Sequence, residues 1–253
     1  MKLSEVRNYS WTCHVVDDAQ SYDIVGKTLA DGATWQRQPM PKGIARRLGR
    51  DAGRELEAIF VAPQRFVVAT AEGWRTLDEL PKRHRDWQDE SEWYYVSLPV
   101  VRSPSMPADE NDPHGFNLPP VIFPILRERD PDRAYTNAQF ALALPHDQLA
   151  IVVSSHDEWR VDGDQVSGSL TDLGARLLLV YDGHEYITPV VADGRFRLVV
   201  AGGVVTRFTV ELAGIVVVDD RPVVVRQKST TRISEIGTTQ FALPGDARER
   251  LGR

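Results

Sequence analysis

The sequence predicts a mainly β protein in which a smaller α+β part precedes an antiparallel β-sandwich. Between Gln165 and Lys228, short stretches rich in Val, Leu, Ile, Phe and Tyr alternate with Asp-Gly and Gly-Gly dipeptides, which is typical of an antiparallel β domain. The first hundred residues mix strand-like and helix-like patterns, and a proline-rich stretch follows them. We therefore expect an α+β module at residues 1–104, a linker at 105–131 and the sandwich at 132–253.

The first region is expected to begin with two strands and a helix. Trp11–Val16 and Tyr22–Leu29 are rich in aromatic and β-branched residues, and the second run ends at the turn dipeptide Asp31-Gly32. Over Lys42–Ile59 apolar residues recur at every fourth position, with arginines on another face. This spacing predicts an amphipathic helix.

Two further strands and a short helix complete the α+β module. Ala58–Ala62 and Arg65–Ala71 are β-branched and aromatic, and Pro63-Gln64 separates them. Thr76 and Glu79 have the spacing of a capping box, in which each side chain bonds the backbone of the other residue. We expect a short helix there, ended by the proline that follows Leu80.

The stretch from Pro99 to Pro131 is crowded with prolines and is expected to connect the two domains. Proline fixes φ and removes a backbone donor, so this stretch is unsuited to a central strand or a long helix. The domain boundary is placed within residues 105–118.

The second region is expected to contain many short strands with turns every eight to twelve residues, as a sandwich requires. Gly202-Gly203 between two of them is expected to be a hairpin turn. The expected strands are Gln139–Leu144, Leu149–Ser154, Val166–Leu170, Ala175–Tyr181, His184–Val191, Arg195–Val200, Val205–Leu212, Ile215–Val218 and Pro222–Gln227.

Two motifs in this region resemble those of transthyretin-like or carboxypeptidase-regulatory-like domains, which are Ig-like β-sandwiches. Val166–Asp172 reads V-S-G-S-L-T-D, and Ala192–Leu198 contains Asp-Gly followed by Phe196. The resemblance covers about residues 165–228. It implies that Val166–Asp172 opens the sandwich as a strand, that Asp193-Gly194 forms a hairpin, and that Phe196 enters the core. It also implies an accessory or interaction module without catalytic residues of its own.

Composition narrows the compartment and the classes of partner. The net charge of −6 argues against a nucleic-acid-binding protein that relies on a broad positive surface. Cys13 is the single cysteine, which excludes an internal disulfide and fits a reducing compartment. The amino terminus lacks the apolar core of a signal peptide, and no segment approaches the roughly 20 apolar residues that span a bilayer. We expect a soluble cytoplasmic protein.

Catalytic motifs are absent from the sequence, and no cofactor is predicted. The six histidines lack zinc-site spacing, and neither a phosphate-binding glycine loop nor a G-x-S-x-G motif occurs. Cys13 and His14 are neighbours, so on a strand they point to opposite faces and do not form a nucleophile and base pair. The favoured interpretation of Cys13 is a buried structural residue.

Metal binding is left open at one acidic segment. His156 to Asp164 is rich in carboxylates whose oxygens would suit a divalent ion, although solvated turn residues explain the segment equally well. Glu211 and Lys228, with nearby Asp219 and Asp220, form another polar group, for which a turn is the simpler interpretation.

Two groups of side chains are candidates for contact with a partner, although a solvated helix face and core packing explain them as well. One is a row of arginines on the expected helix, and the other is an aromatic cluster beside a polar run. The candidate interaction residues are Arg46, Arg50, Arg54, Trp87, Trp93 and Tyr94.

Three functional hypotheses follow from the sequence. The first is a non-enzymatic accessory or assembly protein that binds a protein partner through the sandwich and the α+β module. The second is an enzyme, such as a metal-dependent hydrolase with an acidic and histidine-bearing site around His156 or between the two domains. The third is a phage or surface structural subunit, which predicts a large symmetric homo-oligomer.

Overall fold

The computed structural model divides the chain into two compact units, residues 1–84 with 132–253, and residues 85–131. In the second unit the strands β7 (Tyr94–Val96) and β8 (Phe123–Ile125) pair antiparallel. The structure describes residues 8–18, 21–40, 55–62, 65–76, 79–80, 94–96, 123–125, 144–179, 189–218 and 221–252.

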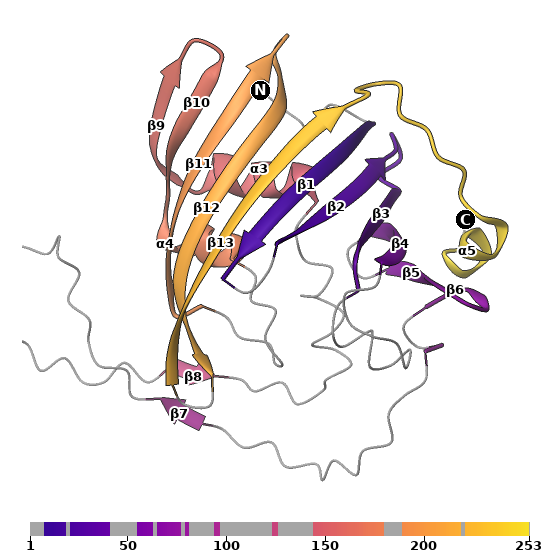
Figure 1. The fold of residues 1–253 in the computed structure, drawn as a ribbon, viewed down its shortest axis with the longest axis horizontal. Coiled ribbons are helices and arrows are strands. Elements are labelled where there is room, and N and C mark those ends of the chain that lie inside the picture. The colour runs from indigo at the N-terminus through magenta and orange to yellow at the C-terminus, as the bar shows by residue number, and fades with distance from the viewer. Residues whose placement is uncertain are drawn as a thin grey trace, which may run out of the picture. The chain divides into compact units, whose positions relative to one another are not determined.

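An antiparallel sheet of eleven strands dominates the described part of the first unit (Figure 1). Its strand order is β6-β5-β4-β3-β2-β1-β13-β12-β11-β10-β9. A mainly β protein is therefore confirmed. The strands are β1 (Tyr9–Asp17), β2 (Ser21–Thr28), β3 (Thr34–Pro39), β4 (Glu55–Ala62), β5 (Arg65–Thr70), β6 (Gly73–Arg75), β9 (His156–Asp162), β10 (Gln165–Leu170), β11 (Val191–Ala201), β12 (Val204–Val218) and β13 (Arg221–Ser234).

The pairing of β1 with β13 joins the two halves of the chain into this one sheet. The register runs from Ser10 opposite Ser234 to Asp17 opposite Gln227. Both strands bury alternate residues on the same face, because Cys13 lies opposite Thr231 and both are buried. The sheet thus continues across the boundary expected between an amino-terminal module and a carboxy-terminal sandwich.

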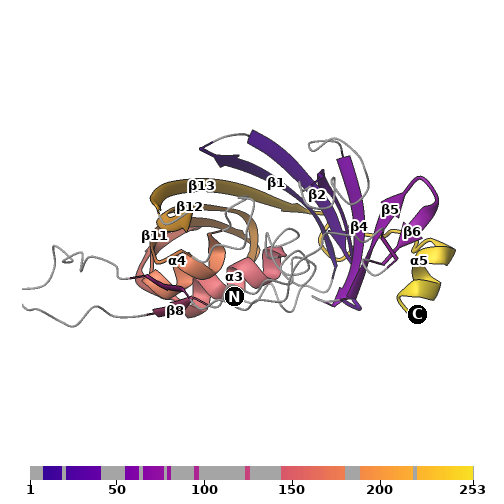
Figure 2. The same cartoon turned by 90° about the horizontal axis from the view of Figure 1, so that it is seen from below.

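Helices α3 (Pro145–Ser154) and α4 (Asp172–Leu178) lie against one face of the sheet (Figure 2). The prediction of a strand at Leu149–Ser154 was wrong, because these residues lie in α3. The prediction of a strand at Ala175–Tyr181 was wrong for residues 175–178, which lie in α4, and residues 180–181 lie outside the described residues. β-Branched and leucine-rich runs occur in strands and in helices, and here the residues at the start of each run favour a helix. Proline occupies the first turn of α3, and the Thr171 hydroxyl caps α4 by accepting a hydrogen bond from the Gly174 amide at 3.1 Å.

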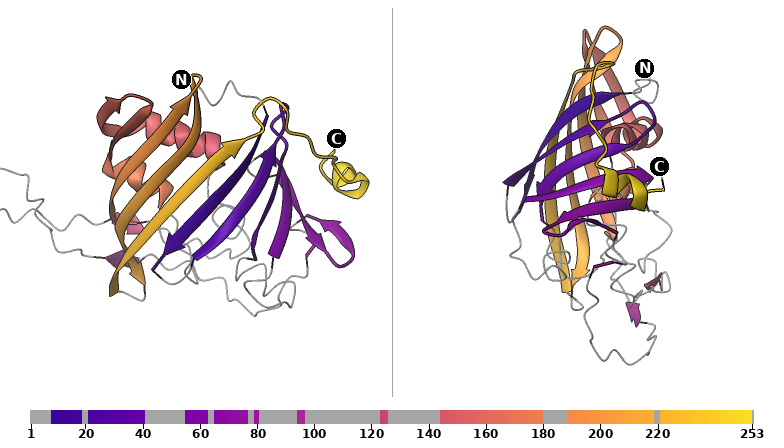
Figure 3. Two further views of the ribbon diagram at one scale, coloured as in Figure 1. Left: turned by 45° about the horizontal axis from the view of Figure 1, so that its top comes forward. Right: turned by 90° about the vertical axis from the view of Figure 1, so that its right-hand side faces the viewer.

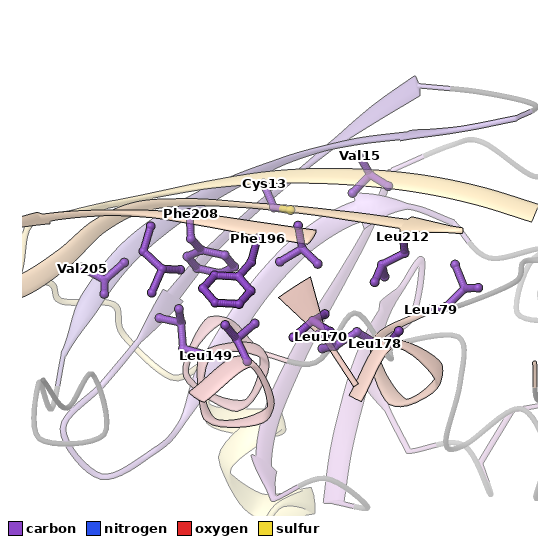
Figure 4. Packing of buried hydrophobic residues seen from close by; sticks show 14 of the residues in the cluster. Cys13, Val15, Leu149, Leu170, Leu178, Leu179, Phe196, Val205, Phe208 and Leu212 are labelled. Atoms are coloured by element: carbon purple, nitrogen blue, oxygen red, sulfur yellow. The ribbon is translucent and has the colours of Figure 1, made fainter. Parts of the chain in front are cut away.

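The main core lies between this helix layer and the sheet (Figure 4). Phe196 and Phe208 project from β11 and β12 and are buried together with Leu149 of α3 and Leu178 of α4. In the part of the chain that the structure describes, helices cover the sheet face that a second sheet would cover in a sandwich. The amino-terminal α+β part and the Ig-like sandwich are thus not confirmed at this level of detail.

Local expectations had mixed outcomes. Gly202 and Gly203 form the expected turn between β11 and β12, with φ of 58° and 80°. Gly194, by contrast, lies within the unbroken strand β11, so the expected hairpin at Asp193-Gly194 was wrong. Its missing side chain makes room for its neighbours, because an added Cβ would lie 2.7 Å from Leu212 Cδ2.

The predicted helix at Lys42–Ile59 was wrong at its carboxyl end. β4 already begins at Glu55, and Leu56, Ala58 and Phe60 are buried on one face in strand alternation. In a strand every second residue lies on the same face, so residues four positions apart share a face as well. A spacing of four therefore fits a strand as well as a helix. Residues 42–54 lie outside the described residues.

A carboxy-terminal clasp, defined as residues 241–252 with α5 (Gly245–Arg250), covers the opposite sheet face at β4–β6 (Figure 3). Leu251 of the clasp is buried with Ile59 and Val67. Asp246 Oδ2 accepts a hydrogen bond from the Trp74 amide at 2.9 Å, and the Arg250 guanidinium pairs with Glu79 at 2.9 Å. The clasp therefore combines apolar burial with contacts that depend on charged carboxylates.

Acid is expected to loosen this clasp. The Thr76 amide and the Arg250 guanidinium hold the pKa of Glu79 below its usual value, and the Trp74 amide does the same for the pKa of Asp246. A carboxyl whose pKa is lower in the folded state stabilises that state above the unfolded-state pKa, and the contribution is lost as pH falls through the folded-state pKa. The loss should therefore occur below about pH 4.

The Leu251 amide, which bonds to the Ala247 carbonyl, provides the measurement. Its hydrogen-exchange protection factor, corrected for the intrinsic rate, should fall between pH 6 and pH 3. In Glu79→Gln the protection should be lower at pH 6 and should change less with pH. Equal protection of the wild-type amide at both pH values would contradict the charged clasp.

Candidate functional site

The candidate site lies on the outer face of the sheet, which is the face turned away from α3 and α4. Side chains alternate between the two faces of a strand. Phe208 on β12 and Cys13 on β1 are buried inward, so their neighbours Arg207 and Thr12 are exposed on the outer face. The strands β12, β13, β1 and β2 lie side by side there, although they come from opposite ends of the chain.

This outer face is rich in cations although the whole chain has a net charge of −6. Asp193 and Glu211 are the acidic residues exposed on the same face of β11–β13. Within the described residues, the exposed basic side chains on the outer face of β11–β13 are Arg195, Arg197, Arg207, Arg226, Lys228 and Arg232.

Some of these cations have acidic partners. Lys228 Nζ lies 2.6 Å from Glu211 Oε1 across the β12–β13 pair, and Arg226 lies 4.0 Å from Asp18. The pKa of Glu211 is held below its usual value, chiefly by the hydrogen bond from Lys228 and further by the charges of Arg197 and Arg195. Glu211 and Lys228 were singled out in the sequence, and the structure shows them as an ion pair across two strands. Asp219 and Asp220 lie outside the described residues.

Arg207 and Arg232 are different, because they lie directly opposite each other in the β12–β13 register. Like charges directly opposite on neighbouring strands destabilise a sheet. Neither guanidinium forms an ion pair with any residue that the structure describes. Two exposed arginines are thus held next to each other without an ion-pair partner in these parts of the chain.

A pocket of about 510 Å³ adjoins the two arginines. Thr12 and Thr230 contribute short side chains to it, and Arg207 and Arg232 contribute long ones. The register places Thr12 next to Arg232, and Thr230 one pair further along β13. The other described residues in the lining are His14, Asp23 and Val25. The pocket therefore offers the guanidinium groups of Arg207 and Arg232 and the hydroxyl of Thr12, and the Thr230 hydroxyl lies 3.2 Å from the Thr209 hydroxyl.

His14 also forms a chain of polar contacts at the edge of this pocket. Its Nδ1 lies 2.7 Å from Asp23 Oδ1, and its Nε2 lies 3.4 Å from the Ser21 hydroxyl. The order serine, histidine, aspartate is that of a nucleophile, a base and an orienting group. The side chains of His14 and Asp23 are 53% and 74% exposed, however, and electrostatic stabilisation of a charged intermediate is weak in water.

Cys13 occupies the face opposite to His14, as the sequence predicts for neighbours on a strand. It is buried, and burial raises the pKa of its thiol to about 11. The neutral thiol is a poor nucleophile. The interpretation of Cys13 as a buried structural residue is therefore confirmed.

The described residues that line this pocket include none of the candidate interaction residues from the sequence. Tyr94 lies in β7, and its side chain is outside what the structure describes. The others, Arg46, Arg50, Arg54, Trp87 and Trp93, lie outside the described residues.

The acidic segment at His156 to Asp164 is an edge strand followed by a turn. His156 begins β9, and its Nδ1 lies 2.9 Å from the Val153 carbonyl oxygen. Its ring lies 4.9 Å from the ring of Trp159. Among the residues that the structure describes, no group of three or more His, Cys, Asp and Glu side chains is placed to hold a metal ion.

The outer-face pocket escaped the sequence analysis because it depends on register. Thr12 and Arg232 are neighbours only because β1 and β13 pair, and more than 200 residues of chain separate them. One signal was present in the sequence: arginines at alternate positions in apolar strands, as at Arg195 and Arg197. Such alternation marks a charged outer face.

No family model matches the chain, and no curated protein is significantly similar to it. Within the described ranges, none of the helices is long and apolar enough to cross a membrane.

Proposed function

We propose that this protein is a non-enzymatic accessory or assembly protein whose outer sheet face binds an acidic surface of a partner protein. The observation that carries the proposal is the pair Arg207 and Arg232, which lie opposite each other and lack an ion-pair partner among the described residues. An acidic partner would remove the repulsion between the two guanidinium groups. The free energy that this repulsion costs the free protein would then be recovered on binding.

A protein partner fits this face better than a nucleic acid does. Sheets that bind single-stranded nucleic acids stack bases on aromatic side chains. The described exposed positions of β11, β12 and β13 hold no aromatic residue. The negative net charge of the chain also opposes long-range attraction of a polyanion.

Two further observations support an accessory role in a reducing compartment. Val166–Leu170 lies in a strand and Phe196 is buried, as the resemblance of about residues 165–228 to transthyretin-like accessory domains implies, although the hairpin it implies at Asp193-Gly194 is absent. Such domains favour binding over catalysis. The single cysteine, Cys13, is buried and free, which fits the cytoplasm. We therefore propose that the interaction takes place in the cytoplasm.

Charge reversal tests this function. The double variant Arg207→Glu with Arg232→Glu should weaken partner binding by about ten- to a hundredfold, because two attractive contacts become repulsive. The matched control is Arg221→Glu with Arg248→Glu, which makes the same change in net charge at exposed positions away from the pocket. Each tagged full-length protein is isolated from its host, and co-purifying proteins are quantified by mass spectrometry.

The most enriched protein is then purified, and its affinity for each variant is measured at two salt concentrations. The proposal expects a loss in the pocket variant alone and weaker wild-type binding at high salt. Equal affinity of the pocket variant and the wild type would refute it, as would an equal loss in the control.

A hydrolase is the second candidate, favoured by the Ser21, His14 and Asp23 contacts. If these residues act as a nucleophile and its base, the wild type should hydrolyse p-nitrophenyl acetate faster than Ser21→Ala does. Rates that are equal in both proteins would remove this candidate and leave the binding function unaffected.

A further inference from the structure

We infer that the outer-face pocket recognises a phosphorylated side chain of the partner protein rather than a carboxylate. This inference rests on the proposed function and specifies the chemical group that the pocket binds. Its basis is the arrangement of Arg207, Arg232, Thr12 and Thr230 around one hollow of about 510 Å³.

The donors in this pocket match a tetrahedral oxyanion. Each guanidinium is a planar fork that donates to two oxygens at once. Arg207 and Arg232 are supplied by neighbouring strands about 5 Å apart. The Thr12 hydroxyl lies on the next strand, β1. The Thr230 hydroxyl lies at the next outward position of β13, 3.2 Å from the Thr209 hydroxyl, and its own proton remains to donate when Thr209 donates to it. A phosphoryl group presents three oxygens to such donors, whereas a carboxylate presents only two.

Charge points in the same direction. A phosphoryl group carries about −1.5 to −2 at neutral pH, and a glutamate or aspartate side chain carries −1. The phosphoryl group therefore neutralises the charge of two adjacent arginines, whereas the carboxylate neutralises only half of it. Phosphorylation of the partner would therefore strengthen its binding to this face.

Among the described residues that line the pocket, Asp23 is the one carboxylate, and it opposes an anion. Its Oδ1 accepts a hydrogen bond from His14 Nδ1 at 2.7 Å. Asp23 lies on β2, and β13 and β1 separate β2 from the strand that carries Arg207. Because Asp23 places a negative charge in the same lining, removal of this carboxylate should improve anion binding.

The test compares three peptides of the form Gly-Gly-X-Gly-Gly, in which X is phosphoserine, glutamate or serine, and inorganic phosphate alone. Binding to the full-length protein is measured by calorimetry. We expect the phosphoserine peptide to bind at least about tenfold more tightly than the glutamate peptide, because it adds charge-assisted hydrogen bonds. Arg207→Gln with Arg232→Gln should abolish this preference, and Asp23→Asn should increase the affinity. The matched control is Arg221→Gln with Arg248→Gln.

Thermal unfolding of each variant shows whether it is folded before binding is measured. Equal affinities for the phosphoserine and glutamate peptides would overturn the inference and leave the proposed function standing. Binding of inorganic phosphate without the phosphoserine peptide would show a free-oxyanion site and would also overturn it. Phosphoserine binding that survives in the double glutamine variant would place the contact elsewhere. Failure of the proposed function is recognised separately, by the charge-reversal experiment with the isolated partner.

Discussion

Replacement of Phe208 by alanine is expected to lower the free energy of unfolding by about 3–5 kcal/mol, which is typical of a large aromatic side chain removed from a core. Phe208 has no exposed surface, and it is part of the cluster between the sheet and the two helices. β12 is paired on both sides, so the sheet has little freedom to collapse into the cavity. Urea unfolding followed by circular dichroism gives the measurement.

Val224→Ala is the matched control for this prediction. Val224 also lies in a central strand, but it is 53% exposed, so its truncation should change stability by at most about 0.5 kcal/mol. Phe208→Leu should cost less than Phe208→Ala, because it leaves a smaller cavity. A similar small loss for the alanine variants at both positions would mean that Phe208 does not belong to the cooperative core.

Gly168→Ala is expected to separate β9 from β10. A Cβ at Gly168 would lie 1.9 Å from the backbone oxygen of Glu158 and 2.7 Å from Phe196 Cζ. The first contact is with backbone, so no side-chain rotation relieves it, and the strands themselves must move apart. The expected cost is about 1–3 kcal/mol or more, in the range of overpacked interiors.

Hydrogen exchange locates this effect. Amides of β9 should lose protection in Gly168→Ala, whereas those of the β1–β13 pair should keep most of theirs. Gly245→Ala is the matched control, since an added Cβ there meets no atom within 4 Å. It should be neutral or slightly stabilising. Intact protection of β9 in the Gly168 variant would show that the strand pair accommodates the methyl group.

The strands with clear alternation or clear turn signals were predictable from the sequence. β1, β2 and β5 each lie within two residues of their expected bounds, and the Gly202-Gly203 turn was found because Gly-Gly between apolar runs favours a tight hairpin. The sequence predicts two strands that end and begin on either side of Ala213-Gly214, yet the single strand β12 runs through this dipeptide. The reason is close packing, because a Cβ at Gly214 would lie 2.6 Å from Leu179 Cδ2.

The single sheet and the candidate site were beyond the sequence because both depend on which distant strands pair. Alternation in β13 indicates which side chains share a face, but it does not name the neighbour of that strand. The contacts of Thr12 with its strand partners Arg232 and Val25 follow only from the register. The helix α4 was missed for a different reason. Its capping residue Thr171 also fits the end of the predicted strand motif Val166–Asp172.

The central position of β1 has a consequence for the order of folding. β1 precedes every other described strand and lies between β2, which follows it at once, and β13, which comes after all the other described strands. Until β13 is synthesised, β1 presents an open edge, and open edges are prone to wrong pairing. Closing the sheet also requires contacts between residues more than 200 positions apart, which makes folding slow. Synthesis of β13 therefore joins β1 to β12, and a chain released before β13 would have two additional unpaired edges, at β1 and β12.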